Sequence, residues 1–405
     1  MNSTDWAPWK HLAARYQERR PRRMLSLDGG GVRGLIAVKA LLRLEALLAQ
    51  HYAQHSGIDP SSFRLCQFFD YVAGTSTGAI VAAAIARGLS VAEILDLYHE
   101  FGRSAFSKRK WYEQWRSLYD HGPLTAKLKA VFTEEATLAP QHLKTLLLIV
   151  ARNAKTDSAW PITSNPAAKY NSMDLPDCNL NIPLWQFVRA STAAPVYFSH
   201  EMLNWVKDDP SQSVAFVDGA TTAYNNPAFC LARMATEPAY RLSWDRGESK
   251  LLVVSFGTGQ IPSLGMDSGS NLATAAVATL KALLSQASFD QDINCRTVGR
   301  CSFGCELDQE IGDLIPRRNP TDLASDPIPL DEDLGRAFLY ARYDVALTRP
   351  GLQSLNLPHI DSRQVAKLDS VNAMKQLEEI GDAMANQVRL EHFGRFTEEP
   401  LFTDG

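Results

Sequence analysis

Residues 68–88 read Phe-Phe-Asp-Tyr-Val-Ala-Gly-Thr-Ser-Thr-Gly-Ala-Ile-Val-Ala-Ala-Ala-Ile-Ala-Arg-Gly. An apolar run from Phe68 to Ala73 stops at Gly-Thr-Ser-Thr-Gly, and small aliphatic residues follow. This pattern predicts a strand, a tight turn and a helix. The turn has the spacing G-x-S-x-G, in which a sharp bend raises a serine hydroxyl, here that of Ser76, clear of the sheet. Gly74 and Gly78 would avoid collisions between the turn and its neighbours.

A second glycine-rich turn lies upstream, where the apolar residues 24–27 precede Asp28-Gly-Gly-Gly-Val-Arg-Gly34 and a helical pattern follows. Its glycines also satisfy G-x-G-x-x-G, the dinucleotide fingerprint, which requires an acidic residue at the end of a second strand about 20 residues later. Glu45 lies inside the helical pattern and Asp59 lies in a turn, so the dinucleotide interpretation is disfavoured. The alternative is an oxyanion hole, formed by backbone amides that would face Ser76.

Short apolar runs begin near residues 24, 68, 145, 214 and 251, and glycine turns or helical patterns separate them. This alternation predicts an α/β fold with a mainly parallel sheet, whose functional residues gather at the carboxyl ends of the strands. Ser76, Asp218 and the upstream glycine turn each follow such a run. We therefore expect them at one edge of the sheet.

A nucleophilic serine needs a group that accepts its proton. Of the nine histidines, only His200 lies near an expected strand end, and a lone loop histidine is more often structural. Asp218 ends the run Val214–Val217 and is followed by Gly-Ala. A partly desolvated carboxylate can act as the base without an imidazole, so the spacing favours Asp218.

Composition limits the classes of function. The chain has 405 residues, 45% of them hydrophobic and 21% charged, and its net charge of -4 argues against a mainly nucleic-acid-binding protein. It has no apolar run of about 18 residues and no secretory leader pattern, so we expect a cytoplasmic protein. Cys295, Cys301 and Cys305 lie together without a fourth ligand nearby, which predicts structural thiols and no metal site.

Three further segments carry expectations. Residues 1–23 end in Arg-Arg-Pro-Arg-Arg, which predicts a solvated basic arm or a patch for anionic lipids. Residues 104–119 are basic and aromatic, include Lys108, Arg109 and Lys110, and fit either a lipid interface or an ordinary surface helix. Residues 161–176 are expected to form a long loop. The domain boundaries expected are 1–23 for the arm, 24–360 for one catalytic domain and 361–405 for a C-terminal helical segment packed on the same domain. Its largely helical part, 362–393, is expected to pack on the sheet.

The three ordered motifs, Asp28-Gly-Gly-Gly-Val-Arg-Gly34, Gly74-Thr-Ser-Thr-Gly78 and Asp218-Gly-Ala220, resemble those of the patatin-like phospholipase family. Residues 190–198, 225–228 and 255–259 support the resemblance, which is strong over about residues 22–260. It implies a three-layer α/β sandwich with helices on both faces of the sheet. It also implies a Ser76–Asp218 dyad and an oxyanion hole formed by Gly29, Gly30 and Gly31, with Arg33 beside it. Asp-Gly-Ala stands here where the family often has Asp-Gly-Gly.

The resemblance implies a lipid acyl hydrolase of the phospholipase A type, which works without metal or cofactor and contacts membrane lipids peripherally. An alternative is an effector phospholipase of bacterial defence that a small molecule, such as a cyclic oligonucleotide, activates. No motif identifies a nucleotide pocket. A non-catalytic dinucleotide-binding protein is the third hypothesis. The oligomeric state, including a homodimer, stays open.

Overall fold

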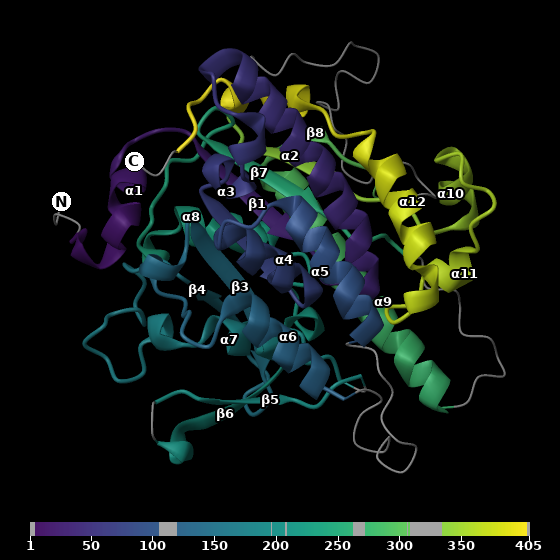
Figure 1. Cartoon of the computed structure of the whole chain (residues 1–405), viewed down its shortest axis with the longest axis horizontal. Helices are drawn as coiled ribbons and strands as arrows, with labels where there is room; N and C mark the ends of the chain where they lie inside the picture. The colour runs from purple at the N-terminus through teal and green to yellow at the C-terminus, as the bar shows by residue number, and fades with distance from the viewer. Residues whose placement is uncertain are drawn as a thin grey trace.

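A computed structural model describes residues 5–104, 120–195, 197–206, 209–261, 272–305, 307 and 334–402. Within these residues the core is one nine-stranded sheet in the order β5-β6-β3-β2-β1-β7-β9-β8, with β4 paired to β3 (Figure 1). The strands are β1 Arg22–Leu27, β2 Tyr71–Thr75, β3 Leu146–Asn153, β4 Ala159–Thr163, β5 Glu201–Asn204, β6 Ser213–Asp218, β7 Leu251–Phe256, β8 Arg300–Phe303 and β9 Leu339–Tyr343. Strands β3, β2, β1, β7, β9 and β8 run parallel, whereas β4, β5 and β6 pair antiparallel. The predicted α/β fold is confirmed.

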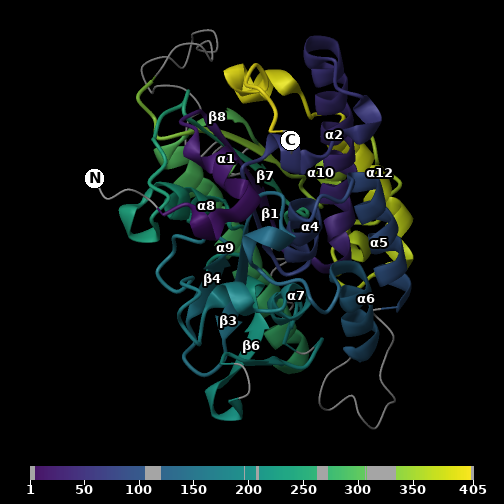
Figure 2. The ribbon, with the colours of Figure 1, turned by 60° about the vertical axis from the view of Figure 1, so that its left-hand side comes forward.

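Helices cover both faces of this sheet, as Figure 2 shows. Successive side chains of a strand point to opposite faces: Leu25 of β1 packs into one hydrophobic cluster and Met24 into the other. The first cluster includes residues of α2, α4, α7 and α12, and the second includes residues of α8. The helices are α1 Ala13–Gln17, α2 Gly34–Ser56, α3 Leu65–Phe68, α4 Thr77–Ala86, α5 Val91–Ser104, α6 Gly122–Phe132, α7 Leu184–Ser191, α8 Ala228–Thr236, α9 Leu272–Val298, α10 Arg349–Ser354, α11 Ser362–Val365 and α12 Met374–Ala385. The result is the expected three-layer sandwich.

Some element boundaries differ from the sequence-based expectations. The apolar run that starts at Phe68 is not strand throughout, because Phe68 ends the short helix α3 and β2 begins only at Tyr71. Pro161 lies in strand β4 and not in a loop. A proline is tolerated there because β4 pairs with β3 alone and is an edge strand of the sheet.

The basic run that leads into β1 is only partly solvated, which corrects the expectation of a solvated arm: Arg19 is exposed, but the two arginines that begin β1 are buried. Arg22 is 4% exposed and Arg23 is fully buried. Both belong to a group of four arginines, Arg15, Arg20, Arg22 and Arg23, around the buried carboxylate of Asp70 just before β2. Three contact it through the guanidinium, and Arg23 through its backbone amide. We call these five residues the Asp70 cluster. It lies where β1 and β2 begin, at the edge of the sheet opposite to Ser76.

The C-terminal segment also differs from expectation, because its main helix packs on another helix instead of on the sheet. Helix α12 lies along α2, where Lys39 forms an ion pair of 3.0 Å with Asp382. A Cβ on Gly381 would lie 2.7 Å from the side chain of Lys39, so the two helices approach closely at that glycine. Sequence periodicity identifies the helix but does not identify the surface that it covers.

Other expectations concern chemistry more than fold. Ser90 and Glu93 form a capping box at the start of α5, each accepting a hydrogen bond from the other's backbone amide. Cys295, Cys301 and Cys305 are free thiols. Residues 105–119, and with them Lys108, Arg109 and Lys110, lie outside the described part of the chain. No helix of that part is long and apolar enough to cross a membrane.

Candidate active site

Ser76 occupies the predicted sharp turn between β2 and α4. Its backbone has φ 55° and ψ −129°, a conformation that costs a non-glycine residue roughly 1–3 kcal/mol. The flanking glycines let this turn pass close to other backbone. A Cβ on Gly74 would lie 2.2 Å from the carbonyl oxygen of Gly78, and one on Gly78 would lie 2.4 Å from that of Leu27. Both positions therefore exclude any side chain, as expected.

Asp218 lies at the same edge of the sheet as Ser76, at the end of an antiparallel strand. It ends β6, which runs antiparallel to β3 with Ala151 opposite Asp218 and Asn153 opposite Phe216. Strand β6 starts beyond the carboxyl end of β3 and stops at that end. Its last residue is therefore brought to the edge where the parallel strands finish. Asp218 therefore lies at the expected edge of the mainly parallel sheet, on a strand that runs antiparallel to its neighbours.

The side chains of Ser76 and Asp218 meet directly. Ser76 Oγ donates a hydrogen bond of 2.7 Å to Asp218 Oδ2, and the amide of Ala220 donates one of 2.8 Å to Asp218 Oδ1. Ser76 is 7% and Asp218 is 2% exposed. Burial raises the pKa of Asp218 to about 7, against the opposing effects of the two hydrogen bonds and the positive charge of Arg189. A carboxylate with this pKa accepts a proton far more readily than an ordinary aspartate near neutral pH.

The end of helix α7 and the residues after it contact both members of this pair. The hydroxyl of Ser191 accepts a hydrogen bond of 2.9 Å from the amide of Ser76, and the carbonyl of Ala193 accepts one of 3.0 Å from the amide of Asp218. Sequence reasoning did not assign a role to either residue. The stretch 190–198 supported the family resemblance, but nothing in its pattern identifies the partners of these two groups.

The upstream glycine turn packs against Ser76. A Cβ on Gly29 would lie 2.9 Å from the Cβ of Ser76. The amide of Gly29 already donates a hydrogen bond of 3.1 Å to the carbonyl of Asn225, so it is not free for a substrate oxygen. The amide of Gly30 makes a longer contact of 3.3 Å with Thr77 Oγ1. Of the three expected amide donors, Gly29 is thus bonded to a main-chain carbonyl and Gly30 to the side chain of Thr77.

Arg33 follows this glycine turn and is buried. Its Nη1 donates a hydrogen bond of 3.0 Å to the carbonyl of Gly259, while Asp344 Oδ1 accepts one of 2.9 Å from the amide of Gly259. Burial lowers the pKa of Arg33 to about 10, which still leaves the guanidinium charged at neutral pH. The structure therefore holds a fixed cation next to the glycine turn, as the motif predicted.

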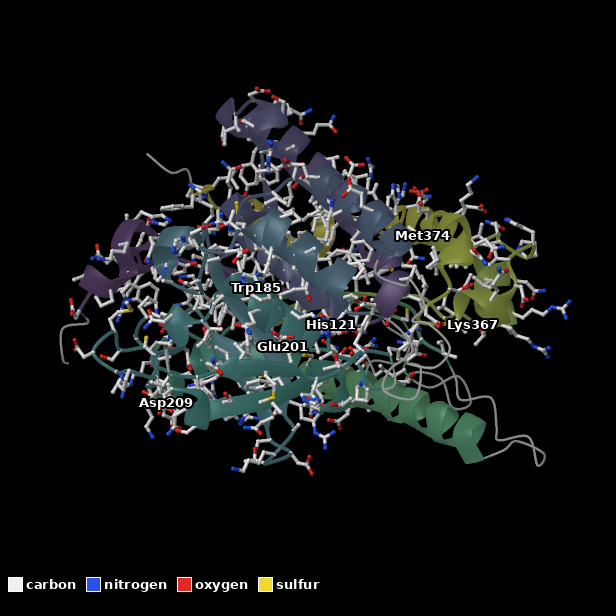
Figure 3. The ribbon with its side chains drawn as sticks, turned by 60° about the horizontal axis from the view of Figure 1, so that its bottom comes forward. His121, Trp185, Glu201, Asp209, Lys367 and Met374 are labelled. Atoms are coloured by element: carbon white, nitrogen blue, oxygen red, sulfur yellow. The ribbon has the colours of Figure 1, made fainter. Side chains whose placement is uncertain are left out.

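The remaining candidates lie apart from this pair. His200 is exposed, and the groups that bind the carboxylate of Asp218 are Ser76 and Ala220. Among the described residues, no group of three or more His, Cys, Asp or Glu side chains is arranged to hold a metal ion. Figure 3 views the molecule from the side of the β5–β6 hairpin, with Glu201 and Trp185 near the middle of the view and Lys367 and Met374 toward the C-terminal helices.

The chain is similar to several known proteins and matches one family model. A model of the family described as patatin-like phospholipase matches residues 25–231. The intracellular phospholipase A2 of Caenorhabditis elegans is 30% identical over 273 residues, which cover 64% of this chain and 22% of that protein. The 85/88 kDa calcium-independent phospholipase A2 of Mus musculus is 29% identical over 265 residues, 62% of this chain and 29% of that protein.

A bacterial relative has a more similar length. The cGAMP-activated phospholipase of Vibrio cholerae is 28% identical over 218 residues, which cover 51% of this chain and 56% of that protein. The chain spans less than a third of the length of the two animal relatives. The residues that the family model matches include the turn at Ser76, the glycine turn and Asp218.

Proposed function

Because this chain belongs to the patatin-like phospholipase family, we propose that it hydrolyses fatty-acyl esters of glycerophospholipids with Ser76 as nucleophile and Asp218 as base. One observation carries the proposal: the hydrogen bond of 2.7 Å from Ser76 Oγ to Asp218 Oδ2. It joins a hydroxyl on a strained turn to a buried carboxylate whose pKa is raised to about 7. That is the pairing that nucleophilic catalysis needs.

In the first half of the reaction, Ser76 Oγ attacks the ester carbonyl carbon while Asp218 takes the hydroxyl proton. The carbonyl oxygen becomes an oxyanion, which the amides of Gly30 and Gly31 stabilise with the positive charge of Arg33 nearby. The tetrahedral intermediate then collapses. The bond to the lysolipid oxygen breaks, that oxygen receives the proton from Asp218, and an acyl-Ser76 ester remains.

In the second half, water replaces the lysolipid. Asp218 takes one proton from the water, whose oxygen attacks the acyl carbon and forms a second oxyanion in the same place. Collapse breaks the bond to Ser76 Oγ, which recovers its proton from Asp218, and the fatty acid leaves. A single carboxylate thus performs every proton transfer, and no step as written uses a metal ion. The name of the calcium-independent relative supports this part of the proposal.

The test is product analysis by mass spectrometry with mixed phospholipid vesicles. A phosphatidylcholine with palmitate at sn-1 and oleate at sn-2 assigns the position, because the fatty acid released identifies the bond cleaved. We expect release in excess chelator, and none from Ser76→Ala or Asp218→Asn. Normal turnover by folded Ser76→Ala would refute the serine mechanism, and loss of wild-type activity in chelator would refute metal independence.

A second candidate function is a phospholipase that stays inactive until a small molecule binds. The name of the Vibrio cholerae relative supports it. In either case we place the enzyme in the cytoplasm, in peripheral contact with membrane lipid. Fatty-acid release measured with and without cyclic dinucleotides, including cGAMP, separates the two functions. Equal rates would refute activation by these ligands, and a rate that rises from near zero would establish it.

A further inference from the structure

The nucleophilic turn has a backbone amide that needs a partner. Ser76 follows the last residue of β2 and adopts a positive φ of 55°, and its amide donates its hydrogen bond to a side chain. A buried amide without an acceptor is unfavourable, and a strained turn persists only where its surroundings fix it. The residue that accepts this hydrogen bond therefore also fixes the direction in which the Ser76 side chain points.

That acceptor is the side chain of Ser191, at the end of α7. Ser191 Oγ accepts a hydrogen bond of 2.9 Å from the Ser76 amide and donates one of 2.6 Å to the carbonyl of Val150 on β3. Ser191 is fully buried. Because its one donor hydrogen is used on β3, the oxygen lone pairs must face the turn. The Ser191 hydroxyl thus connects α7 with β3, to which it donates, and with the turn at Ser76, from which it accepts.

The neighbouring residues make different contacts. The hydroxyl of Thr192 donates a hydrogen bond of 3.0 Å to the carbonyl of Arg189 within the same helix end. The carbonyl of Ala193 accepts one from the amide of Asp218. In this stretch, therefore, the side chain of Ser191 binds the Ser76 amide and the carbonyl of Ala193 binds the Asp218 amide. The Thr192 hydroxyl binds neither residue.

We propose that Ser191 is a positioning residue that holds Ser76 in its strained conformation, so that Ser76 Oγ remains aligned between Asp218 and the ester. The inference rests on the proposed hydrolase function and deepens it. Its consequence is specific: loss of the Ser191 hydroxyl misaligns the nucleophile but leaves the contacts of the base in place. Misplacement of a reacting group by about 1 Å can cost about 10²-fold in rate.

The first test compares Ser191→Ala with the matched control Thr192→Ala, which removes the adjacent buried hydroxyl. A fluorophosphonate, which forms a covalent adduct with a reactive serine, counts the active sites, and kcat per active site is measured on a chromogenic short-chain ester. We expect kcat to fall at least about tenfold in Ser191→Ala and to stay within about twofold in Thr192→Ala. The KM and the midpoint of the acidic limb of the pH profile should not move.

Equal losses in the two variants, or a Ser191→Ala kcat within twofold of wild type, would overturn the proposal. So would a loss that disappears when rates are expressed per active site, since that result indicates fewer folded molecules and no misalignment. If Ser191→Ala does not fold, Ser191→Cys replaces it. The thiol has similar size and is a weak acceptor, so its kcat should lie below that of wild type.

A second readout does not depend on activity. Hydrogen exchange is followed in the peptide that contains residues 74–78, where the Ser76 amide loses its acceptor only in Ser191→Ala. We expect faster exchange there than in Thr192→Ala, and unchanged exchange would overturn the proposal. If the wild-type protein neither reacts with the fluorophosphonate nor releases fatty acid, the hydrolase function fails. The exchange result still decides whether Ser191 holds the turn.

Discussion

Arg342 donates two hydrogen bonds to Asp28, the residue that begins the glycine turn. Nη1 lies 3.1 Å from Oδ1, and Nη2 lies 2.7 Å from Oδ2. Arg342 is on β9, beyond the residues that match the family model. It also bonds Asp344, which holds the amide of Gly259. The glycine turn is thus anchored by charges from the later part of the chain.

We predict that Arg342→Lys lowers kcat about tenfold, because an ammonium ion cannot make the two parallel hydrogen bonds that fix Asp28. Arg300→Lys is the matched control. Arg300 is similarly buried and paired with Glu248 at 2.9 Å, but it lies on β8. Both changes should lower the melting temperature, and only Arg342→Lys should lower kcat per active site. Equal kcat in the two variants would contradict the role of Arg342.

The pH dependence of hydrolysis should follow Asp218. Only its ionised form can accept the proton of Ser76, and burial raises its pKa to about 7. We therefore expect kcat/KM to fall tenfold per pH unit below about pH 7 and to level off above it. The measurement is a rate profile from pH 5 to 9 on the chromogenic ester. A value of kcat/KM that stays level down to pH 5 would show that Asp218 titrates as an ordinary carboxyl group.

The same pKa has a consequence for stability. In the unfolded chain Asp218 ionises at its usual low pKa, whereas in the native state it stays protonated up to about pH 7. Between these values the native state binds more protons, so the contribution of Asp218 to stability falls as pH rises. Asp218→Asn removes this cost. We expect the inactive variant to be more stable than wild type by roughly 1–3 kcal/mol at pH 8.

The advantage of Asp218→Asn should shrink as the pH is lowered from 8 to 5, because the wild-type carboxyl group is then neutral in the native state. Denaturant unfolding at the two pH values measures the difference. An increase in stability that is the same at both pH values would mean that the substitution acts through packing and not through the charge of Asp218. A loss of stability at pH 8 would show that the hydrogen bonds of the carboxylate outweigh its burial.

The Asp70 cluster should govern stability and not the chemical step. Burial favours the neutral form of Asp70, but the charges of Arg15, Arg20, Arg22 and Arg23 outweigh burial and hold its pKa well below the usual range. Asp70→Asn leaves these buried cations without their carboxylate. We predict a loss of about 3–5 kcal/mol in the free energy of unfolding, with kcat per active site unchanged.

Asp157→Asn is the control for that change. It removes a carboxylate whose partner Arg152 lies 2.8 Å away on the surface, with Asp157 mostly exposed. Such pairs contribute at most about 1 kcal/mol. Denaturant unfolding compares the two variants. Similar small losses would mean that backbone carbonyls alone satisfy the four arginines.

The sharp turn at Ser76 could be predicted from sequence because the residues that determine it are close together in the chain. An apolar run, two glycines at fixed spacing and a helical pattern all lie within residues 68–88, and the steric reasons for Gly74 and Gly78 are those expected. The location of Asp218 could also be predicted, since a short antiparallel strand that overlaps only the end of β3 stops at the same edge as a parallel one. The direction of that strand had no local signal.

What could not be predicted depends on partners far apart in the chain. A run of arginines indicates a solvated segment, because burial of several charges is costly, and only the position of Asp70 in three dimensions reverses this conclusion. The Gly29 amide is unavailable because Asn225, 196 residues later, accepts its hydrogen. The hydrogen bond from the Ser76 amide to the Ser191 hydroxyl likewise joins residues that are 115 positions apart in the chain.

Ser76 and Asp218 are attached to the sheet to different extents, because β6 pairs antiparallel with only the end of β3. Ser76 stands at the end of β2, which pairs with a strand on each side. Asp218 belongs to the β5–β6 hairpin, which joins the sheet through only three register pairs with β3 and extends from the lower end of the molecule in Figure 1. A displacement of that hairpin would move Asp218 relative to Ser76, because Ser76 does not belong to the hairpin. The separation of the two side chains therefore depends on how firmly the three register pairs between β3 and β6 hold the hairpin to the sheet.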